Sequence, residues 1–280
     1  MSKAPKLVVR DVADVPLREV SGFALRGNEV LAVGDREPTI FTAAVDSWPL
    51  QWRGTDLSTL ELPDGGKQFE AVTPTGATTV LILQEQPARV LQIDLAGPAL
   101  LGSMLLEVPE GHPLCEAWLG DRSSRGESIL LTERGHLLVV KEKDPAAILE
   151  FGPPGDQPVG WRRGVAGVAP APADTTLTVL ATWTLNRELR KQLPDISDAT
   201  VGPDGCIYLL SDQGSAIARV ADDLDPAGGE VAPEAVWRIA GRPENAEGLV
   251  ILTDGTALVG VDTSSPRRNV LRLGPLALKT

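Results

Sequence analysis

The amino-acid sequence predicts an all-β fold built from repeats, and three observations support this prediction. The 280 residues include 28 glycines and 23 prolines, which interrupt the chain too often for long helices and suit turns between short strands. Short apolar runs recur between these turns, and 42% apolar residues are enough for a sizeable core. A layout of strand, turn, strand, turn and strand returns at regular intervals.

The strands are predicted in chain order from this layout. The first copy has strands at 21–25, 30–35 and 39–41, and the second at 69–76, 79–85 and 89–94. A third, looser copy is predicted at 115–119 and 129–133, and a faint fourth at 165–170 and 177–183. The last two have strands at 197–201, 207–212 and 216–218, and at 247–251, 257–262 and 269–271.

Polar residues recur at a fixed offset within these copies. The same separation along the chain joins Glu70 to Glu85, Ser197 to Asp212, and Glu247 to Asp262. The separation is slightly shorter in the first copy, between Ser21 and Asp35, and slightly longer in the third, between Glu116 and Glu133. Both acidic positions are absent from the fourth copy. Repeats therefore begin near residues 21, 70, 116, 165, 197 and 247.

A period of about 46–50 residues with three or four strands per unit is typical of a β-propeller. Six blades are favoured. Five is the alternative, because the fourth and fifth starts lie closer together than any other pair and the stretch 165–195 can belong to an enlarged third blade. A strand near residues 7–10 is expected to complete the last blade and close the ring. Residues 1–280 then form one propeller domain.

Charge and composition exclude several classes of function. The formal net charge of −12 and the lack of a concentrated Lys/Arg face argue against nucleic-acid binding. No apolar run has the length of a signal-peptide core or a membrane span, so we expect an acidic cytoplasmic protein without a membrane partner. Cys115 and Cys206 stand alone in the sequence, which indicates neither a zinc knuckle nor a disulfide framework.

The repeats resemble those of the SdiA-regulated β-propeller family, which is itself similar to phytase-like and gluconolactonase-like propellers. The resemblance covers nearly the whole chain and rests on short segments: Ser21-Gly22, Glu70, Glu116, Leu138–Pro145, Leu209–Asp212 and Ala246–Leu249. Ala71, Ala117 and Asp198 replace glycines of the family pattern. The resemblance implies a propeller with a divalent cation near its channel.

The recurring acids at the starts of the first strands predict a metal site. Side chains there converge on one mouth of the channel, so Glu70, Glu116 and Glu247 are the candidate ligands, with Ser21 and Ser197 at equivalent positions. Ca²⁺ is the expected ion because it takes roughly 6–8 oxygen ligands. The alternative is structural, with these acids capping turns or accepting backbone N–H groups between blades.

The second acidic set ends the second strands and precedes turns. An Asp before a turn can accept a backbone N–H two residues ahead, which explains its recurrence without any ligand. Loops on one propeller face also bind ligands, so a small molecule or protein is the expected partner there. The candidate ligand-binding residues are Ser21, Asp35, Arg36, Glu133, Arg134 and Asp262.

Catalytic residues cannot be assigned from the sequence. The chain has two histidines, which excludes a three-histidine metal site, and both His112 and His136 are predicted to be loop or surface-turn residues. Phosphate-loop, nucleophile-elbow and dinucleotide motifs are missing. Two function classes stay open: a ligand-binding or scaffold propeller, and a metal-dependent hydrolase of an ester, lactone or phosphoester.

Overall fold

The computed structural model describes residues 4–63, 67–121, 124–220 and 223–279. In this part of the chain, antiparallel pairing groups most strands into five four-stranded units. From the innermost strand outward, the first three are β3 (Val20–Arg26), β4 (Glu29–Gly34), β5 (Thr39–Ala44) and β6 (Arg53–Asp56); β7 (Phe69–Pro74), β8 (Thr79–Gln84), β9 (Arg89–Asp94) and β10 (Ala99–Glu107); and β11 (Ser128–Leu131), β12 (Leu137–Lys141), β13 (Ala147–Gly152) and β15 (Asp174–Leu185).

The fourth unit consists of β16 (Asp198–Val201), β17 (Ile207–Ser211), β18 (Ala216–Val220) and β21 (Pro233–Ile239). The fifth contains β22 (Ala246–Ile251), β23 (Ala257–Val261), β24 (Val270–Leu273) and β2 (Val9–Ala13). The remaining elements are short: β1 (Lys6–Leu7), β14 (Trp161–Arg162), β19 (Asp223–Leu224), β20 (Gly229–Val231), α1 (Cys115–Gly120) and α2 (Arg187–Gln192).

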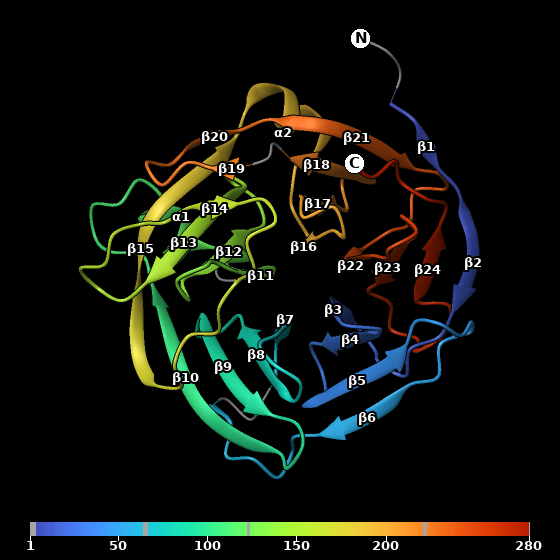
Figure 1. Ribbon diagram of the computed structural model, residues 1–280, viewed down its shortest axis with the longest axis horizontal. Coiled ribbons are helices and arrows are strands. Elements are labelled where there is room, and N and C mark those ends of the chain that lie inside the picture. Colours follow the sequence, from blue (N-terminus) through green and yellow to red (C-terminus); the bar gives the residue numbers. More distant parts are fainter. Residues whose placement is uncertain (1–3, 64–66, 122–123, 221–222, 280) are drawn as a thin grey trace.

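The units are arranged as a β-propeller, which confirms the predicted fold class (Figure 1). The innermost strands contact one another in the cyclic order β3, β7, β11, β16, β22 and back to β3. The fifth unit joins both ends of the chain, because β2 pairs antiparallel with β24. β1 pairs parallel with β21, the outer strand of the fourth unit. No helix among the described residues is long and apolar enough to cross a membrane.

The preference for six blades is wrong over the described residues, where the strands pair into five units. Residues 165–173 form no strand, and the predicted strand 177–183 lies within β15. β15 pairs antiparallel with β13 as the outer strand of the third unit and pairs parallel with β10 of the second. Its twelve residues therefore complete one blade and bridge to the neighbouring blade, so this stretch does not form a blade of its own.

The hydrophobic core is divided among the spaces between neighbouring units. The cluster containing Leu130, Trp183 and Leu209 fills the space between units three and four, and comparable clusters fill the other four spaces. The second strands are buried throughout, as in β12 and β17, because neighbouring units cover both of their faces. Face-to-face packing of this kind fixes the innermost strands around the axis.

Candidate functional site

Three innermost strands begin with a β-bulge at the same place. The pairing register shifts between Val20 and Gly22 in β3, between Phe69 and Ala71 in β7, and between Ala246 and Gly248 in β22. The residues skipped by these shifts are Ser21, Glu70 and Glu247. A bulge bends the strand and redirects the side chain of the extra residue. These three side chains therefore occupy equivalent positions, as the repeat predicted.

The other two units repeat this arrangement just before their first strand. The Glu127 N–H donates to the Val140 carbonyl at 2.9 Å, and the Ser197 N–H donates to the Leu210 carbonyl at 3.0 Å. Val140 and Leu210 are also the pairing partners of the next residues, Ser128 and Asp198. The five equivalent positions are Ser21, Glu70, Glu127, Ser197 and Glu247.

The prediction of Glu116 at this position is wrong. Glu116 lies on α1 and is exposed, whereas Glu127 precedes the innermost strand of the third unit. The repeat predicts the segment 129–133 as a second strand, but β11 is the first strand of its unit. Glu127 and Glu142 have the same separation as the polar pairs of three other copies, so the sequence contained the signal that identifies them.

A second set of acids follows the second strand of every unit. Its members are Asp35 after β4, Glu85 after β8, Glu142 after β12, Asp212 after β17 and Asp262 after β23. Glu142 replaces the predicted Glu133, which lies in the β11–β12 turn and pairs with Arg162. We call the eight carboxylates of the two sets the acidic end of the ring: Asp35, Glu70, Glu85, Glu127, Glu142, Asp212, Glu247 and Asp262.

Burial and mutual repulsion raise the pKa values of several of these acids. Burial raises the pKa of Glu70 and Glu127 well above the usual value, and Glu127 contributes a further increase at Glu70. Burial, followed by the Asp212 and Glu142 charges, raises the pKa of Glu247 to about 9. The pKa of Glu85 rises to about 7, again mainly through burial. Negative charge thus accumulates at close range, where it favours protons or a cation.

Glu127 has little compensation for its charge. Its side chain is 7% exposed, and no donor among the described residues makes a hydrogen bond to its carboxylate. The Lys143 charge lowers the pKa of Glu127, but this is the weakest of the main influences on that pKa. Burial and the Glu247 charge raise it more strongly. The Lys143 ammonium is engaged with Glu142 at 2.8 Å. A largely buried carboxylate without a protein donor favours a proton or a cation.

The predicted ligand-binding residues divide between two places. Ser21, Asp35, Arg36 and Asp262 come together, because the Ser21 hydroxyl donates to Asp35 at 3.0 Å and both Asp35 and Asp262 raise the pKa of Arg36. The strongest influence on Arg36 is its hydrogen bond to Glu19. Glu133 and the exposed Arg134 lie at the other end of β11, so they are separate from this group.

Asp198, a residue that sequence reasoning left without a role, connects four innermost strands. On β16, its carboxylate accepts hydrogen bonds from the Ser128 hydroxyl at 2.8 Å and the Leu249 N–H at 2.6 Å. It also accepts its neighbour's Ala199 N–H at 2.7 Å and the Phe23 N–H of β3. Burial raises its pKa and these donors oppose the rise. Asp198 is a structural acid in the middle of the ring.

His136 is buried, which corrects the prediction of a surface-turn histidine. Its Nδ1 lies 2.7 Å from Glu150, and its Nε2 lies 3.2 Å from Asp156. Glu150 also accepts the N–H groups of Val159 and Gly160. Both ring nitrogens are therefore engaged in holding the chain that leads to β14, and His136 is not placed to act as a general base at the acidic end.

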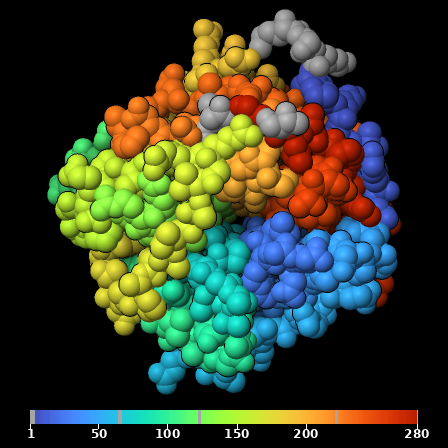
Figure 2. All heavy atoms as spheres, in the orientation of Figure 1, coloured from blue at the N-terminus to red at the C-terminus, as the bar shows by residue number. Residues whose placement is uncertain are grey.

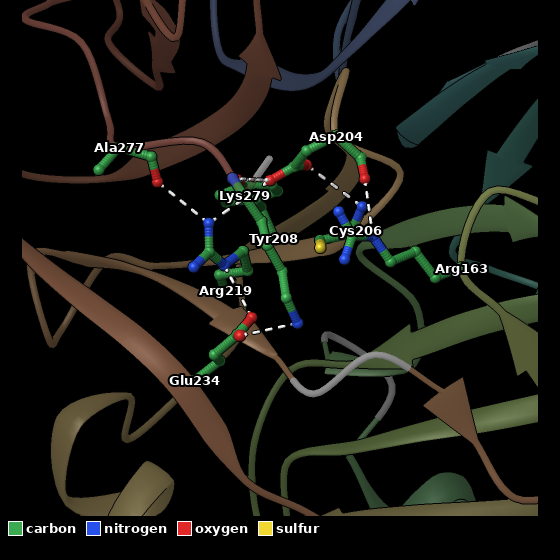
Figure 3. Close-up of polar contacts among 8 residues, drawn as sticks. All are labelled: Arg163, Asp204, Cys206, Tyr208, Arg219, Glu234, Ala277 and Lys279. Atoms are coloured by element: carbon green, nitrogen blue, oxygen red, sulfur yellow. Dashed lines mark hydrogen bonds and ion pairs between the residues drawn. The ribbon is translucent and has the colours of Figure 1, made fainter.

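A second polar network holds the C-terminal segment (Figure 3). Arg219 is 9% exposed; it contacts Asp204 at 3.5 Å and Glu234 at 3.0 Å, and donates to the Ala277 carbonyl at 3.0 Å. Asp204 accepts the Lys279 N–H at 2.9 Å. The nearby Cys206 thiol has a pKa raised by burial, so this cluster is structural. Because these contacts join residues that are far apart in the chain, no local sequence pattern predicts them.

The acids do not form a ready-made metal centre. No three His, Cys, Asp or Glu side chains of the described residues are arranged closely enough to hold one metal ion. Glu70, Glu127 and Glu247 nevertheless have the oxygen donors that Ca²⁺ prefers. Ion binding would require these carboxylates to come closer together.

Comparisons with known proteins agree on the fold. No protein-family model matches the chain, and no curated protein matches it either. The chain is similar to the crystal structure of Myxococcus xanthus glutaminyl cyclase at 13% identity and a TM-score of 0.54, covering 98% of this chain and 100% of the other. It is equally similar to the PQQ-bound aldose sugar dehydrogenase of Streptomyces coelicolor, with 13% identity, a TM-score of 0.54 and coverage of 96% and 97%. These likenesses show the fold alone.

Proposed function

We propose that this propeller is a ligand-binding protein that holds a divalent cation, Ca²⁺ foremost, at its acidic end. Glu127 carries the proposal, because it is 7% exposed, has no hydrogen-bond donor among the described residues and adjoins Glu70 and Glu247. A cation would offset the repulsion that raises the pKa of these acids. A small molecule or protein would then bind at the same face, using the cation as part of its site.

The resemblance to the SdiA-regulated family points in the same direction, since it also implies a divalent cation near the channel. The two structures described above do not indicate a particular reaction for this chain. One is a glutaminyl cyclase and the other an aldose sugar dehydrogenase, so similar scaffolds carry unrelated reactions.

Calcium binding is tested by calorimetric titration and by melting curves in Ca²⁺ and in chelator. A ligand present at 100 times its dissociation constant stabilises the folded state by about 2.7 kcal/mol, which raises Tm by roughly 5–10 °C for a chain of this size. Glu127→Gln should abolish both the heat of binding and the shift in Tm.

Glu116→Gln is the matched control, because Glu116 is exposed on α1 although the sequence alone predicts it in the site. It should bind Ca²⁺ as the wild type does. If wild-type Tm is the same in Ca²⁺ and chelator and no binding heat is seen, the proposal is wrong. Equal losses in the two variants would also contradict it.

Hydrolysis is the second candidate, and Glu85 favours it. Its pKa of about 7 allows this carboxyl group to exchange protons near neutral pH, close to the acids that would hold the cation. The cation would polarise an ester, lactone or phosphoester and lower the pKa of bound water. Glu85→Gln should remove turnover on a panel of such substrates while preserving Ca²⁺ binding. If the wild-type protein shows no turnover, hydrolysis is rejected and only the binding function is retained.

A further inference from the structure

The end of the ring opposite the acids contains a cavity of about 410 Å³. Its walls come from the later residues of β3, β7, β11 and β16, whereas the acids lie where these strands start. Residues 164–167, Trp161 and Gly205 complete the lining. Figure 2 shows the hollow at the centre of this face, bordered by the blue and teal first two units and by the yellow-green segment around residue 160. The volume is within the range of small-molecule sites.

The cavity is uncharged in a strongly acidic protein. Its described lining contains no Asp, Glu, Lys, Arg or His side chain, and its apolar walls include Phe23, Leu25, Val72, Ile129, Leu131 and Trp161. Two other pockets among the described residues have arginine in their walls. An uncharged wall gives no compensation for a desolvated ion, so a neutral ligand fits this cavity.

Two polar groups of the lining lack protein partners. Trp161 is 4% exposed and Thr200 is 8% exposed, and within the described ranges neither the indole N–H nor the hydroxyl has a hydrogen-bond partner. By contrast, the indole N–H of Trp183 donates to the Asp225 carbonyl at 3.0 Å. Neither of these two atoms is sealed from solvent, so both can donate to a ligand with an acceptor atom.

The segment at the rim is held in place from both sides. β14 pairs with β19, Arg163 Nε donates to the Asp204 carbonyl at 2.9 Å, and the Val168 N–H donates to the Thr132 carbonyl at 2.9 Å. Gly167 lies so near Leu131 that an added Cβ would be 2.4 Å from the Leu131 Cβ. Val165 and Val168 are 41% and 51% exposed, which leaves apolar surface at the rim.

We infer that this cavity binds a small uncharged molecule with an apolar ring body and one hydrogen-bond acceptor. The ring would contact the apolar walls, and the acceptor would take the Trp161 or Thr200 proton. The inference is independent of the proposed cation site, since the two sites share no residue and lie at opposite ends of the ring.

The test uses Prodan, a neutral naphthalene ketone whose emission shifts to the blue in apolar surroundings. We expect saturable one-to-one binding with a blue shift. Ala166→Phe adds volume at the lining and should weaken binding about tenfold, a loss of ~1.4 kcal/mol. Ala77→Phe is the control, because Ala77 is another exposed alanine but lines a different pocket. Melting curves verify that both variants fold.

Trp161→Phe tests the hydrogen bond. It should weaken Prodan binding about fivefold, as expected for loss of one neutral hydrogen bond, and leave the binding of N-phenyl-1-naphthylamine, which has no carbonyl, nearly unchanged. Glu127→Gln and chelator should alter neither probe, which separates this result from the test of the cation site. No saturable blue shift with the wild type, or equal weakening by Ala166→Phe and Ala77→Phe, would overturn the inference.

Discussion

Hydrogen-bond donors determine what each buried acid of this protein can do. Asp198 and Glu127 are both almost inaccessible, at 1% and 7% exposure. Asp198 receives donors from its own and three neighbouring strands, so its carboxylate is satisfied by the fold. Glu127 receives none from the described residues. The first acid therefore connects strands, and the second is left to bind a proton or a cation.

Asp198→Ala should lower the free energy of unfolding by about 3 kcal/mol, because it leaves the Leu249 N–H and the Ser128 hydroxyl buried without their acceptor. Urea unfolding followed by circular dichroism measures the change. The control is Asp174→Ala, an exposed aspartate at the start of β15, which should change the free energy by less than about 0.5 kcal/mol. Equal effects would show that the Asp198 contacts do not stabilise the fold.

The raised pKa values predict how stability depends on pH without a cation. The pKa of Glu247 is raised from 4.5 to about 9, so between these values the folded state binds more protons than the unfolded state. Stability from this group is complete below about pH 4.5 and is lost as the pH rises toward 9. In chelator, Tm should therefore fall between pH 5 and 9. Glu247→Gln should flatten the slope, whereas the exposed Glu107→Gln should not. If the dependence of Tm on pH is unchanged in Glu247→Gln, Glu247 is not the group that causes it.

The innermost strands place the acids through bulges and close approach. In β3, a Cβ added to Gly22 would be 2.6 Å from the Glu70 carbonyl oxygen of β7. Glycine here lets two strands approach at the point where Ser21 and Glu70 face the same end of the ring. Spacing along the strand and the absence of a side chain thus act together to position this part of the acidic end.

Gly22→Ala should separate β3 from β7 and lower the free energy of unfolding by about 2–3 kcal/mol, since the clash is with backbone that cannot rotate away. If the cation site exists, Ca²⁺ affinity should fall as well, because Glu70 moves with β7. Gly97→Ala is the control, as nothing lies within 4 Å of its added Cβ. Denaturant unfolding and calorimetry give the two readouts, and a stable Gly22→Ala variant would disprove the close-packing argument.

The whole molecule depends on closing the ring between its two ends. β2 supplies the outer strand of the unit that contains β22, β23 and β24. Without it, the edge of β24 would be unpaired and the space beside Val270 and Leu273 opened to water. Closure joins strands from opposite ends of the chain, so it stabilises contacts between the first and fifth units.

Deletion of residues 1–16 should therefore lower Tm by at least about 5 °C, because it removes β1, β2 and their buried side chains. A synthetic peptide of residues 4–16 should restore most of this loss in a concentration-dependent manner. A peptide with Ala13→Pro is the control, since Ala13 pairs with Val270 and proline removes a strand N–H. Full stability of the deletion variant would contradict a role for ring closure.

The repeat by itself determined the all-β class, the propeller architecture and most of the acids, because strand length, turn residues and a recurring offset are local properties of the chain. It correctly gave Ser21, Glu70, Ser197 and Glu247 equivalent positions. It did not identify Glu127 and Glu142, because the apolar residues of α1 resemble those of a first strand. Periodicity does not say which apolar segment pairs with which.

Only the tertiary structure decided the number of blades, the role of Asp198 and the uncharged cavity. β15 is an outer strand because it pairs with the edges of β13 and β10. No local sequence pattern predicts which strands will be its partners. Asp198 is satisfied by groups on three other strands, and the cavity is lined by four strands and a crossing segment. Such environments arise when distant segments pack together, so the sequence supplies the residues and the fold supplies their surroundings.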